Sequence, residues 1–349
     1  MRLGIDDYGL RHQHWDPITL TQRCIELGAT NLMFSVDNIP VHDVTTYSHM
    51  RKIAEDAGMT IEAAGMNWNP HGDSQRLATP AEQDEVRDRV RSWIEIAGCI
   101  GAKVLRGVMS AGNLTRDAAV PLGIQIEDTA GLLRDMLPEA RKQGIDFLAP
   151  EIHWDLTARE MLLLLEKVGD DHVGVTYDSG NPFCMLEDPV EAAELLKDRI
   201  VSSHIRDSAV KRTMDGVVVQ WTVMGIGSAR LAEIRDIIDS TNPQCAWNIE
   251  IILDNGPESL PFLQQEFWTP GWSSMPASQL SRFLQLVEKG GTWPAEAEDY
   301  CIHPARGGDA TPESLAAQEW QGNIRSWQYS RDVLGIPDRA ALDMLESDD

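Results

Sequence analysis

Cysteine is scarce in this sequence, and the cysteines that occur follow no motif. There are five in 349 residues, an odd number without a C-x-x-C pair. A disulfide framework needs an even, patterned set, so we expect reduced thiols and a cytoplasmic protein. The five are Cys24, Cys99, Cys184, Cys245 and Cys301.

Long hydrophobic runs and basic residues are also lacking. No stretch of 18 apolar residues occurs, and the N-terminal MRLGIDDYGL has no apolar signal-peptide core. We therefore expect neither a membrane span nor an export signal. Lysine and arginine number 30 against 55 aspartates and glutamates, a formal net charge of −25. Because such a surface repels phosphate groups, we expect neither nucleic acids nor anionic membranes as partners.

The chain shows a regular alternation of strand and helix patterns between residues 1 and 255. Eight such units predict an α/β protein with a (β/α)8 TIM barrel. The alternative is a doubly wound open sheet, which would carry G-x-G-x-x-G after its first strand if it bound a dinucleotide. The segment GIDDYGLRHQHWDP contains no such motif. The expected strands cover residues 1–6, 30–36, 59–66, 102–109, 145–153, 172–178, 200–205 and 245–253.

Residues 256–349 contain no ninth unit of this kind. They include one clear helical pattern near 276–289 and a helical tail. We expect the barrel to occupy residues 1–255 and a C-terminal helical extension, 256–349, to pack on it. Its tryptophans, Trp268 and Trp272, are expected either to pack the extension on the barrel or to cover a bound group or partner.

Four consecutive expected strands end on, or carry near their ends, a carboxylate or an imidazole. These residues are Glu151, Asp178, His204 and Glu250. Each alone has an ordinary explanation: Asp178 as a turn former, for example, or His204 as a satisfied core histidine. Four together are harder to dismiss, because the C-terminal strand ends of a barrel meet at one face. Buried carboxylates this close repel one another unless a cation lies between them. The sequence therefore predicts a site for one divalent ion, and mostly oxygen ligands suit Mn²⁺, Mg²⁺ or Co²⁺.

The E…D…H…E order, with HIRD at the seventh strand, resembles the xylose isomerase-like TIM barrel superfamily. That group includes sugar isomerases, ketose 3-epimerases, abasic-site endonucleases and some sugar lyases. The resemblance covers about residues 1–255. It implies that all four residues bind one ion, usually manganese, with His204 as the neutral nitrogen ligand. Its second ring nitrogen would then be held by an outer acceptor.

A divalent ion at this place can polarise a carbonyl and a neighbouring hydroxyl of a bound sugar. A base then removes the adjacent proton and leaves an enediolate, which is reprotonated by an isomerase or epimerase and loses a β-substituent in a lyase. Ketose 3-epimerases resemble this chain at the ligands but differ at three further positions. The sequence has Thr157 where they have glutamate, Asn181 where they have histidine and Val210 where they have arginine.

His153 is expected either to act as the base or to orient the metal site. It lies two residues after Glu151, so both side chains point to the same face of an extended strand. An imidazole can titrate near neutral pH. The large subunit of C-glycoside deglycosidases looks similar, with a histidine near its first glutamate. That resemblance implies a lyase acting on 3-oxo-glycosides with a small partner subunit, and a homo-oligomer is the other assembly we consider. The expected catalytic residues are His153, Glu151 and Glu250.

Further polar residues near the strand ends are expected to bind the sugar. Trp68 is suited to stacking on a sugar face, and Arg206 could replace the arginine missing at Val210. The remaining alternatives are an isomerase or 3-epimerase, a distant endonuclease that the acidic charge disfavours, and a barrel without catalytic activity. The expected substrate-binding residues are Asn67, Trp68, Arg106, Asn181 and Arg206.

Overall fold

We describe the protein from a computed structural model. It describes residues 1–36, 43–72, 76–110, 116, 119–272, 275–293 and 311–347. Cys301 lies outside these ranges, and the other four cysteines are free thiols. None of the helices in this part of the chain combines the length and apolar character that a bilayer-spanning segment needs.

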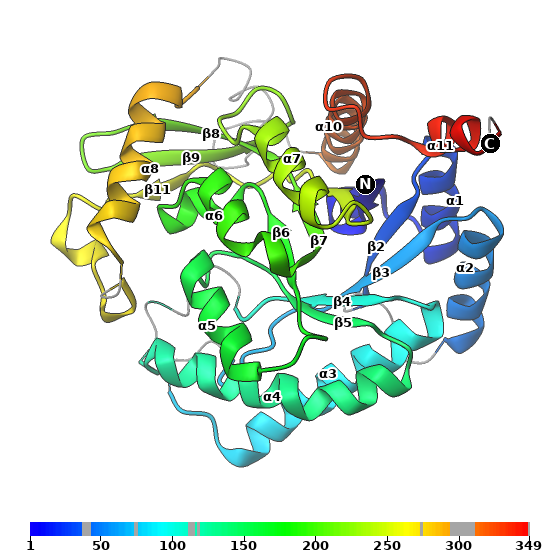
Figure 1. Cartoon of the computed structure of the whole chain (residues 1–349), viewed down its shortest axis with the longest axis horizontal. Coiled ribbons are helices and arrows are strands. Elements are labelled where there is room, and N and C mark those ends of the chain that lie inside the picture. The colour runs from blue at the N-terminus through cyan, green and yellow to red at the C-terminus, as the bar shows by residue number, and fades with distance from the viewer. Residues whose placement is uncertain are drawn as a thin grey trace.

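Eight parallel strands form the centre of the molecule (Figure 1). Their order in the sheet is β5-β4-β3-β2-β1-β10-β7-β6. The two edge strands meet through the bridges Leu148–Val173 and Glu151–Thr176, so the sheet curves round into a barrel. This confirms the predicted (β/α)8 barrel. The strands are β1 (Arg2–Asp6), β2 (Asn31–Ser35), β3 (Thr60–Ala64), β4 (Val104–Gly107), β5 (Phe147–Pro150), β6 (Val175–Asp178), β7 (Ile200–Ile205) and β10 (Ala246–Ile249).

Helices lie around the outside of the barrel and bury one apolar face each against it (Figure 1). A capping box formed by Thr157 and Glu160 starts α5. Gly28 and Gly169 follow the ends of α1 and α5 with φ of 93° and 66°. Residues with side chains rarely adopt these angles, so each helix ends at its glycine. The helices are η1 (Asp7–Gln13), α1 (Pro17–Leu27), α2 (Val44–Asp56), α3 (Pro80–Ile100), α4 (Leu122–Lys142), α5 (Ala158–Val168), η4 (Asn181–Met185), α6 (Pro189–Leu196), η5 (Lys197–Arg199) and α7 (Leu231–Thr241).

A β-hairpin interrupts the seventh unit, and the sequence analysis took this stretch for a loop. Strands β8 (Asp207–Arg212) and β9 (Val217–Thr222) pair antiparallel, and β11 (Glu258–Leu260) pairs with β9. The three form a separate small sheet beside the barrel mouth (Figure 1). The alternation of apolar and polar residues in VVVQWT is short and comes soon after β7. The stronger strand–helix repeat of the chain therefore obscured it.

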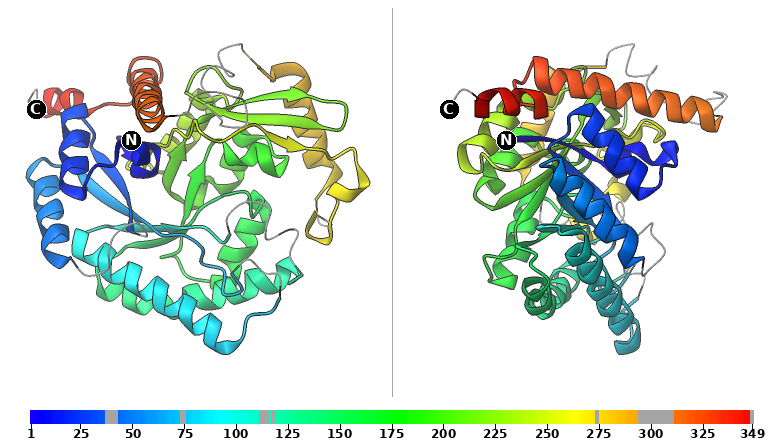
Figure 2. Two further views of the ribbon diagram at one scale, coloured as in Figure 1. Left: turned by 180° about the vertical axis from the view of Figure 1, so that it is seen from behind. Right: turned by 90° about the vertical axis from the view of Figure 1, so that its right-hand side faces the viewer.

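The described residues of the C-terminal segment contribute three further helices. The longest, α10, lies across the N-terminal segment (Figure 2). Its Asn323 donates to the carbonyl of Gly9 at 2.6 Å, and its Ser330 accepts from Trp247 at 3.2 Å. The division into a barrel of residues 1–255 and an extension of residues 256–349 packed on it stays a prediction. The helices are α8 (Ala277–Gly290), α10 (Pro312–Asp332) and α11 (Arg339–Ser347), and the short turns η6 (Gln265–Phe267) and η7 (Pro270–Trp272) precede them.

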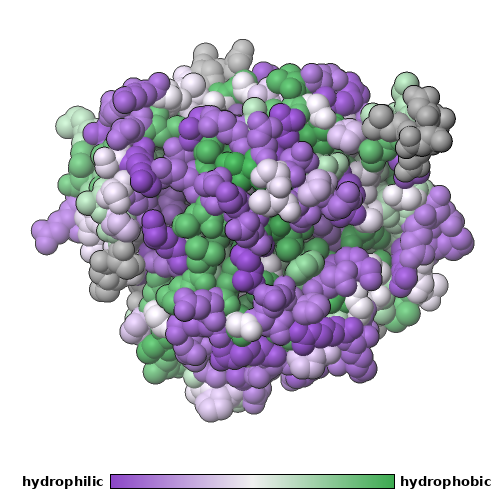
Figure 3. All heavy atoms as spheres, viewed as in Figure 1, coloured by the Kyte–Doolittle hydropathy of each residue, from purple (hydrophilic) through white to green (hydrophobic). Residues whose placement is uncertain are grey.

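Among the tryptophans of this segment, Trp268 lies against the segment itself and Trp272 lies against the connection between β4 and α4. Trp268 donates to the carbonyl of Phe262 at 2.7 Å, and Trp272 stacks under the guanidinium of Arg116 at 4.2 Å. Neither lines the pocket at the barrel mouth. Their placement therefore agrees with the packing alternative. The face shown in Figure 3 is mostly hydrophilic, with hydrophobic residues gathered near its middle.

The buried carboxyl of Glu187, just before α6, gives the fold a pH dependence. Burial raises its pKa from 4.5 to about 8, although the backbone N–H of Ala158 donates to it. Because the folded-state pKa is raised, its favourable contribution is complete below pH 4.5 and is lost as the pH rises through 8. In Glu187→Gln, the fall in the free energy of unfolding over this pH range should be smaller by on the order of 3 kcal/mol.

Urea denaturation at pH 5 and pH 8.5 checks this expectation. The variant should lose less free energy of unfolding than the wild type over this interval, since glutamine keeps an acceptor for Ala158 without titrating. The exposed Glu191→Gln on α6 serves as the control and should behave like the wild type. Equal losses in wild type and Glu187→Gln would contradict the assignment.

Candidate metal centre and active site

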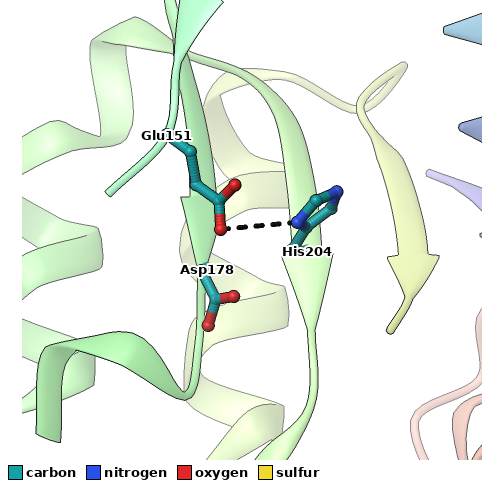
Figure 4. A group of neighbouring side chains, drawn as sticks. All are labelled: Glu151, Asp178 and His204. Carbon is teal, nitrogen blue, oxygen red and sulfur yellow. Dashed lines mark ion pairs between the residues drawn. The ribbon is translucent and has the colours of Figure 1, made fainter. Parts of the chain in front are cut away.

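Four neighbouring strands bring the predicted ligands to one end of the barrel. Asp178 is the last residue of β6 and pairs in register with His204 of β7. Glu151 and Glu250 directly follow β5 and β10. Glu151, Asp178 and His204 are buried, and one ligand atom of each lies within 4.8 Å of the others. The Glu151 carboxylate and the His204 ring point toward one another, with 3.4 Å between Oε1 and Nδ1 (Figure 4).

Glu250 completes the set from the next strand. Its Oε2 lies 3.6 Å from Nδ1 of His204. This oxygen and Nδ1 of His204 are both buried and make no hydrogen bond, although the oxygen also forms an ion pair with Arg206. Buried polar atoms without hydrogen bonds are costly and uncommon. One nitrogen and carboxylate oxygens converging in this way fit a divalent cation of the Mn²⁺, Mg²⁺ or Co²⁺ kind. The identity of the ion stays a prediction.

The second nitrogen of His204 faces an outer carboxylate. Nε2 lies 3.3 Å from Oδ2 of Asp6, the last residue of β1, and 2.7 Å from the sulfur of Met33. Burial disfavours a charged imidazole. The carboxylates of Glu151, Glu250 and Asp6 nonetheless hold the pKa of His204 well above its usual value. An ion that took the place of this proton would meet Nδ1, while Asp6 holds Nε2–H.

Two arginines neutralise the ligand carboxylates. Arg106 of β4 pairs with Glu151, and Arg206, which follows β7, pairs with Asp178 and with Glu250 at 2.7 Å. Burial opposes ionisation of Glu151, but Arg106 and His204 hold its pKa well below the usual value. The guanidinium of Arg206 lies over the ring of Trp221 at 4.3 Å.

A pocket of about 300 Å³ opens above these residues. This volume is at the lower end of the range for small-molecule sites. Its wall combines ionisable groups with aromatic and aliphatic side chains. The lining residues are Asp6, Tyr8, Ser35, Ala64, Met66, Arg106, His153, Trp154, His204, Arg206, Trp221, Glu250, Ile252 and Asn255.

His153 lies in this wall with Nδ1 buried and without a hydrogen bond. Burial, helped by the nearby Arg106 and Arg206 and opposed by Glu151, lowers its pKa from 6.5 to about 4. The ring is therefore neutral at neutral pH, and one nitrogen is free to accept a proton. This is the protonation state that a general base requires.

The predicted sugar-binding residues lie in different surroundings. Arg106 and Arg206 line the pocket, whereas the other three do not. Asn181 is buried behind it, accepts from Trp154 at 2.6 Å and donates to Glu151 at 3.3 Å. Trp68 belongs to the hydrophobic core, and Asn67 precedes it in a left-handed conformation with φ of 62°. The sequence placed Trp68 near a strand end, but its ring packs into the core.

Three aromatic residues of the pocket, Tyr8, Trp154 and Trp221, were missed by the sequence analysis. Trp154 and Trp221 lie with ring centroids 5.0 Å apart. Trp154 directly follows His153, and that position was the only sequence cue for it. Trp221 comes from β9, and an unrecognised hairpin offered no means of finding it.

The contact between Asp6 and His204 leads to a prediction about metal affinity. Asp6→Asn should raise the Kd for Mn²⁺ by about 10- to 100-fold, because outer partners of ligating histidines have effects of this size. Titration calorimetry of the metal-free protein measures it. Met33→Leu removes the other Nε2 contact and is the matched control, expected to stay within a few-fold of wild type. Equal losses in both variants would assign the effect to packing.

Comparisons with known proteins agree with this architecture. A family model described as xylose isomerase-like TIM barrel matches residues 22–266. A crystal structure of D-psicose 3-epimerase in the presence of D-fructose superposes with a TM-score of 0.62 at 15% identity, over 96% of this chain and 100% of that one. A structure of the IOLI protein with a binding zinc atom gives 0.54 at 13%, over 84% and 100%.

A curated relative adds a sequence match of more limited extent. The 3-oxo-isoapionate decarboxylase of Pectobacterium atrosepticum is 33% identical over 86 residues, 25% of this chain. The match spans 31% of that relative's length. The family model, by contrast, covers well over half of the chain, and its extent includes all four predicted ligands. The chain belongs to the xylose isomerase-like TIM barrel family.

Proposed function

We propose that this chain is a divalent-metal-dependent enzyme that removes a proton next to the carbonyl of an oxo-sugar and then eliminates a β-substituent, as a lyase. The observation that carries the proposal is a set of four buried polar atoms around one pocket that make no hydrogen bond, although one of them, Oε2 of Glu250, forms an ion pair with Arg206. They belong to His153, His204, Arg206 and Glu250. Two of them fit a cation, and two are left for a substrate.

Each part of the site has a stated role in this proposal. Glu151, Asp178, His204 and Glu250 would hold the ion, which supplies polarisation of the substrate carbonyl and so makes the adjacent C–H acidic. His153 accepts that proton, because its ring is neutral and its Nδ1 lacks a partner. The aromatic wall of Trp154 and Trp221 excludes water from the reacting carbon.

Elimination is favoured over epimerisation by the surroundings of three residues. Epimerisation needs a second acid–base group to return the proton from the opposite face. Thr157 instead caps α5, the Asn181 amide is engaged by Trp154 and Glu151, and Val210 lies in β8. In elimination, the electron pair of the broken C–H bond forms the new double bond. The leaving group departs with its bonding pair and takes up the proton that His153 accepted.

The curated relative supports an oxo-sugar as substrate. By its name, that protein acts on a 3-oxo compound and removes a carboxyl group. Decarboxylation and β-elimination share a requirement, since in both a ketone makes carbanion character at its neighbouring carbon accessible. A 3-oxo-glycoside meets this requirement at C2 and carries its leaving group at C1.

Incubation of the manganese-loaded protein in D₂O tests the proposal. With a 3-oxo-glycoside we expect release of the aglycone, measured by chromatography. Deuterium at C3 of a free ketose, detected by NMR, would instead support the isomerase or 3-epimerase alternative. Co-purification of a small subunit that is needed for aglycone release would extend the proposal to the predicted partner, and we place the reaction in the cytoplasm.

A further inference from the structure

The pocket contains two buried guanidinium groups that the proposed proton transfer does not use. We propose, building on the function proposed above, that the substrate is a sugar acid whose carboxylate is bound by Arg106 and Arg206. The class includes oxo-sugar acids and their glycosides. The argument comes from the donors of the two arginines.

Arg206 has one nitrogen without a partner. Its Nε donates to Asp178 at 3.3 Å, and its Nη2 contacts Asp178 and Glu250. Nη1 is buried and makes no hydrogen bond, although the side chain is only 2% exposed. The Trp221 ring covers one face of the guanidinium and so fixes its plane. A charged donor in such a position is costly unless a ligand supplies an acceptor.

Arg106 repeats this arrangement on another strand. Its Nε and Nη2 contact Glu151, and its Nη1 reaches only the sulfur of Met66 at 3.2 Å. A thioether is a weak acceptor. The same pocket therefore contains two guanidinium Nη1 groups that have no oxygen acceptor among the described residues.

A carboxylate satisfies these donors better than a hydroxyl does. It offers two oxygens and a negative charge, and hydrogen bonds between charged partners are roughly twice as strong as neutral ones. A cation shared by Glu151, Asp178 and Glu250 would also draw charge away from the arginines and strengthen their attraction for an anion. A neutral sugar would need only hydroxyl contacts, for which two buried guanidinium groups are not required.

Matched ligands test this on the wild-type protein. Titration calorimetry of the manganese-loaded protein compares D-glucuronate with D-glucose, D-galacturonate with D-galactose and D-mannuronate with D-mannose. In each pair, a carboxylate replaces a hydroxymethyl group. At least one acid should bind about 10- to 100-fold more tightly than its neutral sugar, as expected for a charge-assisted hydrogen bond. If no acid binds more tightly than its partner, absent binding included, the inference is overturned.

Two variants separate binding by arginine from binding by the ion. Arg206→Met should abolish the preference for the acid, while Mn²⁺ affinity is followed separately by electron paramagnetic resonance. Trp221→Leu alters no contact with a proposed ligand carboxylate and should lower the preference for the acid several-fold. This variant keeps the test available if Arg206→Met does not fold. Trp272→Leu removes a tryptophan stacked under Arg116 outside the pocket and is the control, with no change expected.

A preference that survives both pocket variants would mean that the acid binds the ion, and this would overturn the role of the arginines. These sugars are not expected to react, so the readout is binding alone. Failure here leaves the D₂O experiment untouched. Failure of that experiment with the acid preference intact would remove the proposed reaction and not the anion site.

Discussion

His153→Ala is expected to lower kcat/KM for the 3-oxo-glycoside by about 100- to 10,000-fold, the usual contribution of a general base. The imidazole lines the pocket, and its Nδ1 is buried without a hydrogen bond. Burial keeps the ring neutral, so it can take up a proton. The loss should appear in kcat, because His153 acts after the substrate is bound.

Two measurements distinguish lost chemistry from lost structure. Mn²⁺ affinity in His153→Ala should stay within a few-fold of wild type, since the four ligands are unchanged. His172→Ala, at an exposed histidine between α5 and β6, is the matched control and should keep full activity. If His153→Ala retains wild-type kcat, the proton is taken by another group and the proposed base is wrong.

Glu250→Gln should raise the Kd for Mn²⁺ by at least about 100-fold, because outer partners of ligands already contribute 10- to 100-fold. Its Oε2 lies 3.6 Å from Nδ1 of His204 and has no hydrogen bond. Activity at limiting manganese should fall in parallel. The fold should persist, because Arg206 keeps its pair with Asp178.

A buried glutamate away from the pocket provides the control for this variant. Glu62 on β3 lies in the barrel interior, where Ser202 donates to it at 2.6 Å and Asn248 at 2.9 Å. Glu62→Gln removes a buried carboxylate as well and should leave Mn²⁺ affinity unchanged. If Glu250→Gln and Glu62→Gln bind manganese equally well, Glu250 is not a ligand.

Much of the fold and the candidate ligand set could be predicted from local pattern. Strand β7 coincides with the run IVSSHI, and α5 begins at the capping box of Thr157. Both signals act within a few residues, so they are readable in one dimension. Glu151, Asp178, His204 and Glu250 could be proposed together because parallel strands in a barrel end at the same face.

The side chains that shape the pocket could not be predicted in this way. Trp221 reaches the barrel mouth on a hairpin that interrupts the strand–helix repeat. Asp6 lies next to His204 because only β10 separates β1 from β7 in the sheet. Trp68 shows the opposite error, since a residue near a strand end points into the core. Which way a side chain points after a strand depends on how the following turn is packed.

The order of strands and helices, the types of candidate ligand and the acidic charge followed from the sequence alone. Each of these depends only on residue spacing or composition. The contacts that give the site its chemistry were settled only by folding. The two guanidinium groups beside the carboxylates, the buried Nδ1 of His153 and the aromatic wall bring together residues as far apart in sequence as Arg106 and Glu250. Closure of the barrel, in which the edge strands β5 and β6 meet through the bridge between Glu151 and Thr176, makes these residues neighbours. Burial then changes their pKa values in ways that no linear pattern contains.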